Sequence, residues 1–216
     1  MAVTSQPPEG TGIPRDASAM LDCMMPVARE DLNDRLLRAV LADPVCRAIL
    51  ERMPGLGLAE WWLTAGAVFQ NVWNSLEGHP AGYGVKDYDV FYFDTDVSWQ
   101  AEDKVIRSAA NVFSDVDADI ELRNEARVHL WYEEKFGTPT APFRAATDAI
   151  DSFAATACAV GVGRGQDSWR VYAPFGLSDT FAMHMKPNRR VAPRHVYEAK
   201  VAQYRQRWPS LTADPW

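Results

Sequence analysis

The chain has 216 residues, enough to bury one hydrophobic core, and its 47% hydrophobic and 24% charged residues are typical of a globular protein. Its formal net charge of −7 repels phosphate backbones and anionic lipids, which argues against extended nucleic-acid or membrane-surface binding. A small anionic ligand in a local pocket remains compatible with this charge. No apolar run has the length of a membrane span, and no signal-like segment stands at the start, so we expect a cytoplasmic protein.

The composition of the chain changes near residue 30, from a segment with few large apolar residues to one with apolar residues at helical spacing. Residues 1–22 are rich in Pro, Gly, Ser and Thr, which predicts a flexible leader, and we expect residues 23–216 to form one domain. From Glu30 onward, apolar residues recur at helical spacing and continue beyond Pro44, which predicts one helix or two short ones that meet at this proline. Their apolar faces are expected to pack into the core.

The remainder alternates between the patterns of strands and helices, with glycine-rich turns between them. We predict strands over 61–64, 87–94, 118–124, 156–163 and 169–175. We predict helices over 67–76, 98–113, 125–136, 145–155 and 194–208, and a short helix within 173–181 that Ser178 or Asp179 caps. This order predicts an α+β (α/β-like) fold in which helices flank a short mixed sheet.

The cysteines and tryptophans suggest packing, not chemistry. Cys23, Cys46 and Cys158 lack the paired spacing of a zinc or redox motif, so we interpret them as buried or incidental thiols in a reducing compartment. The eight tryptophans are expected to fill the core and the wall of a cleft, because base-stacking platforms usually accompany a basic groove.

Two acids at the head of the predicted strand 87–94 are the sharpest chemical feature. Side chains alternate along a strand, so Asp87 and Asp89 emerge on one face and Tyr88 on the other. Two carboxylates on one face can share Mg²⁺, which prefers oxygen ligands and leaves positions for water and substrate phosphates. An Asp-x-Asp pair alone is weak evidence, since acids are common in turns and at strand ends.

The neighbourhood of this pair in the sequence adds weight. Before it, the turn at Gly66-Ala67 opens a helix whose first N–H groups are a natural seat for phosphate. After it, Asp119 and Glu121 on the next predicted strand can bring a third carboxylate beside the first two. The combination favours phosphate chemistry.

At this point the chain resembles the DNA polymerase β-like nucleotidyltransferase superfamily, and more closely a bacterial family of nucleotidyltransferase proteins. The superfamily pattern is a hydrophobic-Gly-small turn, then acid-x-acid on a strand, then a third acid on a neighbouring strand. The segments that carry the resemblance are WWLTAGAVFQNVW, KDYDVFYFD, IELRNEARVHLWY, APFGLSDTF and the late WPSL, which are spread from Trp61 to Leu211.

The resemblance implies a role for each matching residue. Asp87 and Asp89 match the metal-binding pair, and Glu121 matches the third acid, with Asp119 as the alternative. Gly66 and Ala67 match the phosphate turn, where Ala67 replaces the usual Gly or Ser and offers no hydroxyl donor. The implied reaction is attack by an acceptor hydroxyl on the α-phosphate of a nucleoside triphosphate (ATP or another NTP), assisted by Mg²⁺ or Mn²⁺, with pyrophosphate leaving.

Other polar residues near these segments are candidates for nucleotide contacts. Lys86 directly precedes the acid pair, and Asn71 lies little more than one turn after Gly66, where it can bond either the turn or the substrate. Arg127 can turn toward the cleft and bind triphosphate oxygens, or pair with Glu125 or Asp119. His129 is more typical of a structural histidine.

A basic cluster late in the chain is a weaker candidate for contact with a nucleotide or an anionic acceptor. It comprises Lys186, Arg189 and Arg190, which follow His184. Basic clusters are usually solvated surface, and we expect the same here.

The leading hypothesis is therefore a metal-dependent nucleotidyltransferase acting on a small molecule, a protein side chain or an RNA end. One alternative is a non-catalytic nucleotide-binding or partner-binding module of the same fold, in the manner of an antitoxin, which the replacement at Ala67 favours and the intact acids oppose. A second alternative is a metal-dependent phosphohydrolase, which also needs clustered carboxylates.

Overall fold

The computed structural model describes Met1, residues 31–165 and residues 168–216. Residues Leu32–Trp216 form one compact unit. The leader expected over residues 1–22 and the thiol of Cys23 lie outside the described residues. Within the described part of the chain, no helix combines the length and apolar character needed to cross a membrane.

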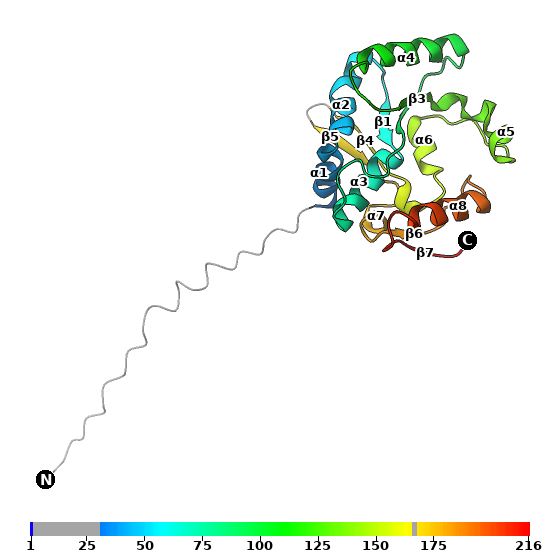
Figure 1. The fold of residues 1–216 in the computed structure, drawn as a ribbon. Coiled ribbons are helices and arrows are strands. Elements are labelled where there is room, and N and C mark those ends of the chain that lie inside the picture. Colours follow the sequence, from blue (N-terminus) through cyan, green and yellow to red (C-terminus); the bar gives the residue numbers. More distant parts are fainter. Residues whose placement is uncertain (2–30, 166–167) are drawn as a thin grey trace. The chain divides into compact units, whose positions relative to one another are not determined.

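A five-stranded mixed sheet forms the centre of this unit (Figure 1). The strands are β1 (Trp61–Thr64), β2 (Tyr88–Tyr92), β3 (Ile120–Asn124), β4 (Gly161–Arg164) and β5 (Trp169–Tyr172). Their spatial order is β3-β2-β1-β4-β5, and β2 and β3 run parallel while the other neighbours are antiparallel. The predicted α+β fold with a short mixed sheet is confirmed.

One face of the sheet is closed by the first three helices. These are α1 (Leu32–Ala42), α2 (Pro44–Arg52) and α3 (Gly66–Glu77), and α1 and α2 meet at Pro44 as predicted. Leu63 of β1 and Val90 of β2 point into this layer and are fully buried with Leu36 and Val72 from the helices. This is the larger of the two hydrophobic clusters.

The opposite face is covered only in part, by the short helix α6 (Ala146–Asp151). Trp62 and Phe91 alternate with the residues of the first face and pack here with Ile150 in a smaller cluster. A Cβ at Gly161 would lie 2.8 Å from Cδ1 of Ile150, so glycine lets this side chain of α6 pack closely on β4. The uncovered remainder of this face is where the acids of β2 and β3 emerge.

The C-terminal segment wraps back onto the first helices. It contains α7 (Ser178–Phe181), β6 (His184–Met185), α8 (Arg194–Arg205) and β7 (Thr212–Ala213), and the parallel pair β6–β7 was not predicted from the sequence. Trp208 packs edge-to-face on Trp73 and donates a hydrogen bond to Asn74 Oδ1 at 2.9 Å. Trp61 and Trp62 are buried as well, which agrees with the expected packing role of the tryptophans.

The helix predicted over 125–136 is wrong as one element. It is a 3₁₀ segment, η2 (Glu125–Leu130), followed by α5 (Tyr132–Phe136), and the break falls at Trp131, whose φ of −130° is not helical. The side chain of Asn124 caps the first turn by accepting the Ala126 N–H. Tertiary contacts of this turn with the start of α4 (Trp99–Val112) override the helical pattern of its sequence.

Three smaller expectations differ from the structure. The strand predicted over 156–163 begins only at Gly161, as β4, and is preceded by a 3₁₀ turn, η3 (Thr156–Cys158). The helix predicted over 145–155 ends at Asp151, as α6. Neither Ser178 nor Asp179 caps α7, because Leu177 occupies that position and the Asp179 carboxylate instead accepts bonds from Thr156 and Lys186. Cys46 and Cys158 are buried free thiols, as interpreted.

Candidate active site

The uncovered part of the sheet opens into a cavity of about 530 Å³. Strands β2 and β3 form its floor. The start of α3 and the loop before β2 form one side, and α8 forms another. Residues of η2, α5 and α6 form the remaining wall. All these elements belong to the single unit described above. Residues far apart in the sequence thus meet around one space.

Three predicted acids lie together on the floor of this cavity. Asp87 immediately precedes β2, Asp89 lies within it, and Asp89 is the register partner of Glu121 on the parallel strand β3. All three line the cavity, whereas Asp119 does not, and Asp119 instead accepts the Tyr88 N–H with its main-chain oxygen at 2.8 Å. The alternation that placed Asp87 and Asp89 on one face therefore agrees with their positions.

The acids influence one another electrostatically. Burial, followed by the negative charges of Asp87 and Glu121, raises the pKa of Asp89 to about 6. Arg123 and Lys200 act in the opposite direction. Glu121 itself forms an ion pair with Arg123 through Oε2. A cation or proton is thus favoured at Asp89, because the field of its neighbours is negative.

Glu125, which the sequence reasoning assigned no chemical role, is a fourth acid at the cavity. It is 2% exposed, and its Oε1 has no hydrogen-bond partner. Burial raises the pKa of Glu125 well above its usual value, and the charge of Asp89 raises it further, although Arg123 lowers it. Only its position directly after the helix-capping Asn124 could have drawn attention to it, since acids are common in the first turn of helices.

The glycine turn lies at the edge of the cavity, but its geometry differs from the expected one. Ala65 precedes α3 with φ 53° and ψ −139°, a conformation that glycine favours, and Ala65 and Gly66 line the cavity. The first N–H groups of a helix have no carbonyl partner within it, so this turn presents donors. Ala67 is fully buried in the core and does not line the cavity, so its missing hydroxyl has no bearing on the floor of the site.

Asn71 also lies outside the cavity and connects three structural elements. Its amide nitrogen donates to Asp43 Oδ2 at 3.1 Å and to the main-chain oxygen of Ala67, and its Oδ1 accepts the Gly82 N–H at 2.7 Å. The Gly82 loop continues to Lys86, which does line the cavity. Asn71 thus holds the loop that presents Lys86 and makes no direct contribution to the cavity wall.

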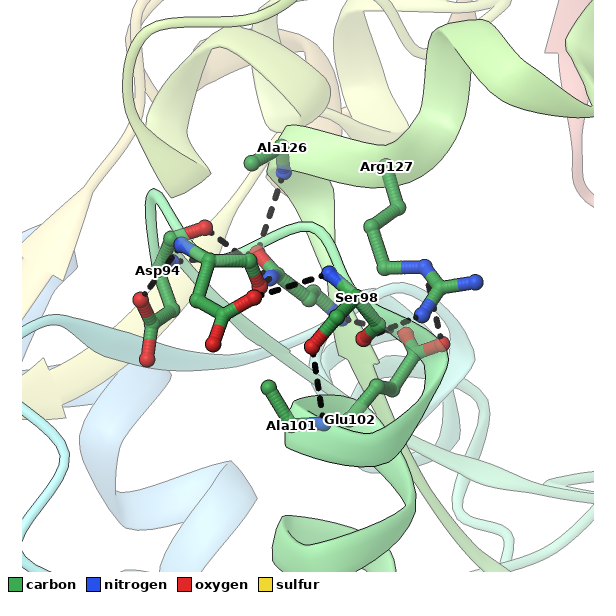
Figure 2. Close-up of polar contacts among 8 residues, drawn as sticks. Asp94, Ser98, Ala101, Glu102, Ala126 and Arg127 are labelled. Atoms are coloured by element: carbon green, nitrogen blue, oxygen red, sulfur yellow. Dashed lines mark hydrogen bonds and ion pairs between the residues drawn. The ribbon is translucent and has the colours of Figure 1, made fainter.

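Arg127 does not line the cavity, and its side chain points toward Ser98 and Glu102 at the start of α4 (Figure 2). Its Nε lies 3.2 Å from Glu102 Oε2, and its NH1 donates to the main-chain oxygen of Ser98 at 2.8 Å. The other Glu102 oxygen accepts the Asn124 N–H at 3.0 Å. Arg127 pairs with neither Glu125 nor Asp119, the two partners considered from the sequence, and its role is to fix η2 against α4 at the end of β3.

Aromatic side chains dominate the wall opposite the acids. Trp131, Tyr132 and Phe136 contact one another with ring centroids 4.6–6.4 Å apart, and Lys135 lies over two of these rings. Phe143 and other aromatic residues extend this wall. A cavity with a charged floor and an aromatic wall suits a ligand that has both an ionic and a planar part.

Residues 51–213 of the chain match the nucleotidyltransferase family model. The chain belongs to this nucleotidyltransferase family. The family places the protein among the transferases of phosphorus-containing groups.

The fold is also found in a solved structure. An NMR structure described as revealing a CCA-adding enzyme head domain aligns with a TM-score of 0.67 and 24% sequence identity, over 86% of this chain and 97% of that one. At this level of identity the similarity extends to the polymerase β-like fold and no further. A search among curated proteins finds no match.

The nucleotidyltransferase has acids suited to a hard cation, but not in a closed cage. Among residues 31–165 and 168–216, no group of three or more His, Cys, Asp or Glu side chains is placed so that it could hold a metal ion as it stands. The donor chemistry nevertheless fits, because Asp87, Asp89 and Glu121 supply only oxygen atoms, the ligands that Mg²⁺ prefers. The ion pair with Arg123 engages one oxygen of Glu121.

The late basic cluster of the nucleotidyltransferase is dispersed into separate contacts. Lys186 pairs with Asp179 and Arg190 with Asp151, and Arg189 lies over the ring of Trp216. None of the three lines the cavity. The histidine considered from the sequence, His129, is also outside the cavity lining, although its buried Nδ1 has no partner.

Proposed function

We propose that this protein transfers a nucleoside monophosphate from a nucleoside triphosphate to an acceptor hydroxyl in a Mg²⁺- or Mn²⁺-dependent reaction in the cytoplasm. The observation that carries the proposal is the meeting of Asp87, Asp89 and Glu121 in one cavity with the N-terminal turn of α3. Family membership supports the class of reaction. The metal, the triphosphate substrate and the hydroxyl acceptor are the parts that we add.

The cation would be held by Asp87 and Asp89, which leaves the free oxygen of Glu121 for the acceptor hydroxyl. When bound, it supplies neutralisation of the phosphate charge and polarisation of the reacting oxygens. Without it, the negative charges of Asp87 and Glu121, which add to burial in raising the pKa of Asp89 to about 6, would also repel the substrate's phosphates. A negative floor therefore requires a positive partner before it can accept a nucleotide.

The residues of the chain position the reactants. N–H groups at Gly66 and its neighbours face the phosphates at the positive end of α3. The acceptor oxygen forms a bond to the α-phosphorus as the bond from that phosphorus to the bridging oxygen breaks, and pyrophosphate leaves with the electron pair. Glu121 Oε1, the oxygen not bonded to Arg123, takes the hydroxyl proton.

The acceptor class remains open between a small molecule, a protein side chain and an RNA end. The net charge of −7 disfavours a long RNA, because the chain as a whole repels a phosphate backbone. The aromatic wall of Trp131, Tyr132 and Phe136 is compatible with any acceptor that has a planar group.

The test is a labelling experiment. The purified protein is incubated with each of the four NTPs labelled at the α-phosphate, Mg²⁺ or Mn²⁺, and cell extract. We expect label to enter an acceptor with at least one NTP, and Asp89→Asn to reduce this transfer by about 10³-fold or more, since positioning and charge neutralisation are the main terms in phosphoryl transfer. Asp103→Asn, which removes an acid paired with Arg107 on α4, is the matched control and should retain activity.

Other outcomes identify the alternative functions. Nucleotide binding without any transfer supports the non-catalytic module. Release of phosphate or pyrophosphate without a labelled acceptor supports a phosphohydrolase. The buried position of Ala67 weakens the argument for the non-catalytic module, because the residue that departs from the family pattern does not contact the cavity.

A further inference from the structure

Helix α8 presents two different faces to the rest of the molecule. Tyr197, Val201 and Tyr204 are buried in the large hydrophobic cluster. Lys200, Gln203 and Arg207 follow at intervals of three and four residues and line the cavity; Arg207 lies in the turn that ends the helix. We call these three residues the α8 polar row. From the sequence alone, residues 194–208 were predicted to form a helix, and no chemical role was assigned to them.

The α8 polar row faces the acids of β2. Lys200 lowers the pKa of Asp89, which burial raises, so its ammonium group acts on this carboxylate across the cavity. Arg207 NH1 donates to the main-chain oxygen of Gly84 at 3.1 Å, in the loop that leads to Asp87. A Cβ at Gly84 would lie 3.1 Å from Cδ of Arg207, so the loop and the end of α8 are in direct contact. The cavity thus has acids on one side and cations on the other.

The cations of this wall are available to a ligand. In the described residues, Lys200 forms no ion pair with a carboxylate, and its Nζ lies 5.9 Å from the centroid of the Tyr204 ring. Lys86, on the adjacent loop, likewise has no carboxylate partner within the described chain. By contrast, Lys186 and Arg190 elsewhere on the surface are paired with acids. Unpaired cations beside a cavity are the expected complement of an anion.

The donors of the row suit a polyphosphate better than a single phosphate. Lys200 lies on α8, and Arg207 lies two residues beyond the end of this helix at Arg205. Their long side chains both reach the cavity, and Gln203 between them adds a neutral donor. A polyphosphate carries more negative charge and more acceptor oxygens than a carboxylate or a lone phosphate, so it engages more of these donors.

We propose that the α8 polar row holds the β- and γ-phosphates of the nucleotide and, after transfer, the leaving pyrophosphate. The inference rests on the proposed nucleotidyl transfer and adds the residues that select a triphosphate. The acids of β2 and β3 act at the α-phosphate, while the row acts at the part of the substrate that leaves. The opposing view is that Lys200 serves only as a counter-charge for Asp89, and the two views predict different binding behaviour.

The test measures binding across a phosphate series by isothermal titration calorimetry, with Mg²⁺ present and AMP, ADP, ATP and inorganic pyrophosphate as probes. The wild-type affinity is expected to rise from AMP to ATP. Lys200→Ala should lower the affinity for ATP and pyrophosphate by about tenfold or more, while the affinity for AMP stays within about twofold. Lys200→Arg should retain most of the binding because it keeps the charge.

The matched control is Arg194→Ala, which removes a cation from the exposed side of the same helix, where Arg194 pairs with Glu198. Its affinities should equal those of the wild type. The proposal is overturned if wild-type protein does not bind pyrophosphate, or if Lys200→Ala binds it normally, or if Lys200→Ala weakens AMP as much as ATP. Because Lys200 is exposed, the variant is expected to fold, and a thermal melt verifies this.

These outcomes are separate from those of the labelling experiment. Normal binding by Lys200→Ala together with wild-type transfer would overturn the role of the row and leave nucleotidyl transfer standing. The expected phosphate series without any transfer would support the row as a polyphosphate site and remove the proposed reaction.

Discussion

The two faces of the sheet use the same strands for opposite purposes. Along β2, Val90 points into the cluster closed by α1, α2 and α3, while its neighbours Asp89 and Phe91 point to the face that α6 covers only in part. Successive side chains of a strand face opposite sides, so one short strand contributes to both the core and the site. The first face stabilises the fold, and the second retains acids whose mutual repulsion opposes folding.

The largest contrast is expected between two tryptophans. Trp73 is fully buried against Phe69 and Trp208, so Trp73→Ala should lower the free energy of unfolding by about 3–5 kcal/mol. Trp131→Ala on the cavity wall should cost about 1 kcal/mol or less, since part of that ring is already solvated. Denaturant titration followed by circular dichroism measures both. Equal losses would show that the aromatic wall is part of the core.

The next contrast compares the stability lost when two ion pairs are broken. Arg127 with Glu102 is the pair of interest, and Arg107 with Asp103 is the control. The first pair is largely buried, with side-chain exposures of 16% and 21%, and the second is at the surface. Arg127→Ala should cost about 2 kcal/mol because it leaves Glu102 without its partner, whereas Arg107→Ala should cost less than about 0.5 kcal/mol. Thermal melts of the two variants measure the difference, and a similar cost for both would contradict the anchoring role of Arg127.

Removing a charge from the cavity face should stabilise the protein. The pKa of Asp89 is raised from 3.8 to about 6, so the folded state holds a proton that the unfolded chain releases between these values. Stability is thus lost as pH rises through this window. Asp89→Asn should be more stable than the wild type by about 3 kcal/mol above pH 6, with little difference below pH 4. Unfolding measured with a chelator at several pH values checks this, and a pH-independent difference would contradict it.

The smallest effect concerns the turn before α3. Ala65 has a φ of 53°, which costs a residue with a Cβ about 1 kcal/mol, so Ala65→Gly should raise the free energy of unfolding by roughly that amount. Ala67→Gly, two residues later and inside the helix, should lower it by about 1 kcal/mol or more. Thermal unfolding of the two variants side by side gives opposite signs if the backbone conformation at Ala65 is the cause.

Local patterns in the sequence were sufficient to predict most of the fold. The helices around Pro44, the strand at Trp61 and the alternation of Asp87 with Asp89 all depend on residues close in the chain. The same reasoning failed over 125–136, because the contacts of Arg127 with α4 come from a distant segment. It also left open whether Asn71 and Arg127 contact the substrate or the protein, since sequence spacing does not tell which direction a side chain takes.

The residues of the candidate site that belong to a local motif could be predicted from the sequence. Those that enter the cavity from a distant element could not. The acids of β2 and β3 follow a motif, but Lys200 and Arg207 enter the cavity only because α8 packs beside the loop at Gly84. The spacing of Lys200, Gln203 and Arg207 on one helical face was a readable signal, although it does not say what that face contacts. Glu125 carried no motif at all, and its burial is known only from the fold.

The parallel pairing of β2 with β3 has a consequence for how this scaffold can vary. Asp89 and Glu121 face each other across a hydrogen-bonded ladder, so their separation depends on strand spacing and not on the length of the connection between them. No residue from 93 to 119, all of which the structure describes, lines the cavity. Variation in the length of this crossover is therefore expected to leave the separation of the acids unchanged, as long as the buried Phe113 and the hydrogen bond from Tyr88 to Asp119 stay in place.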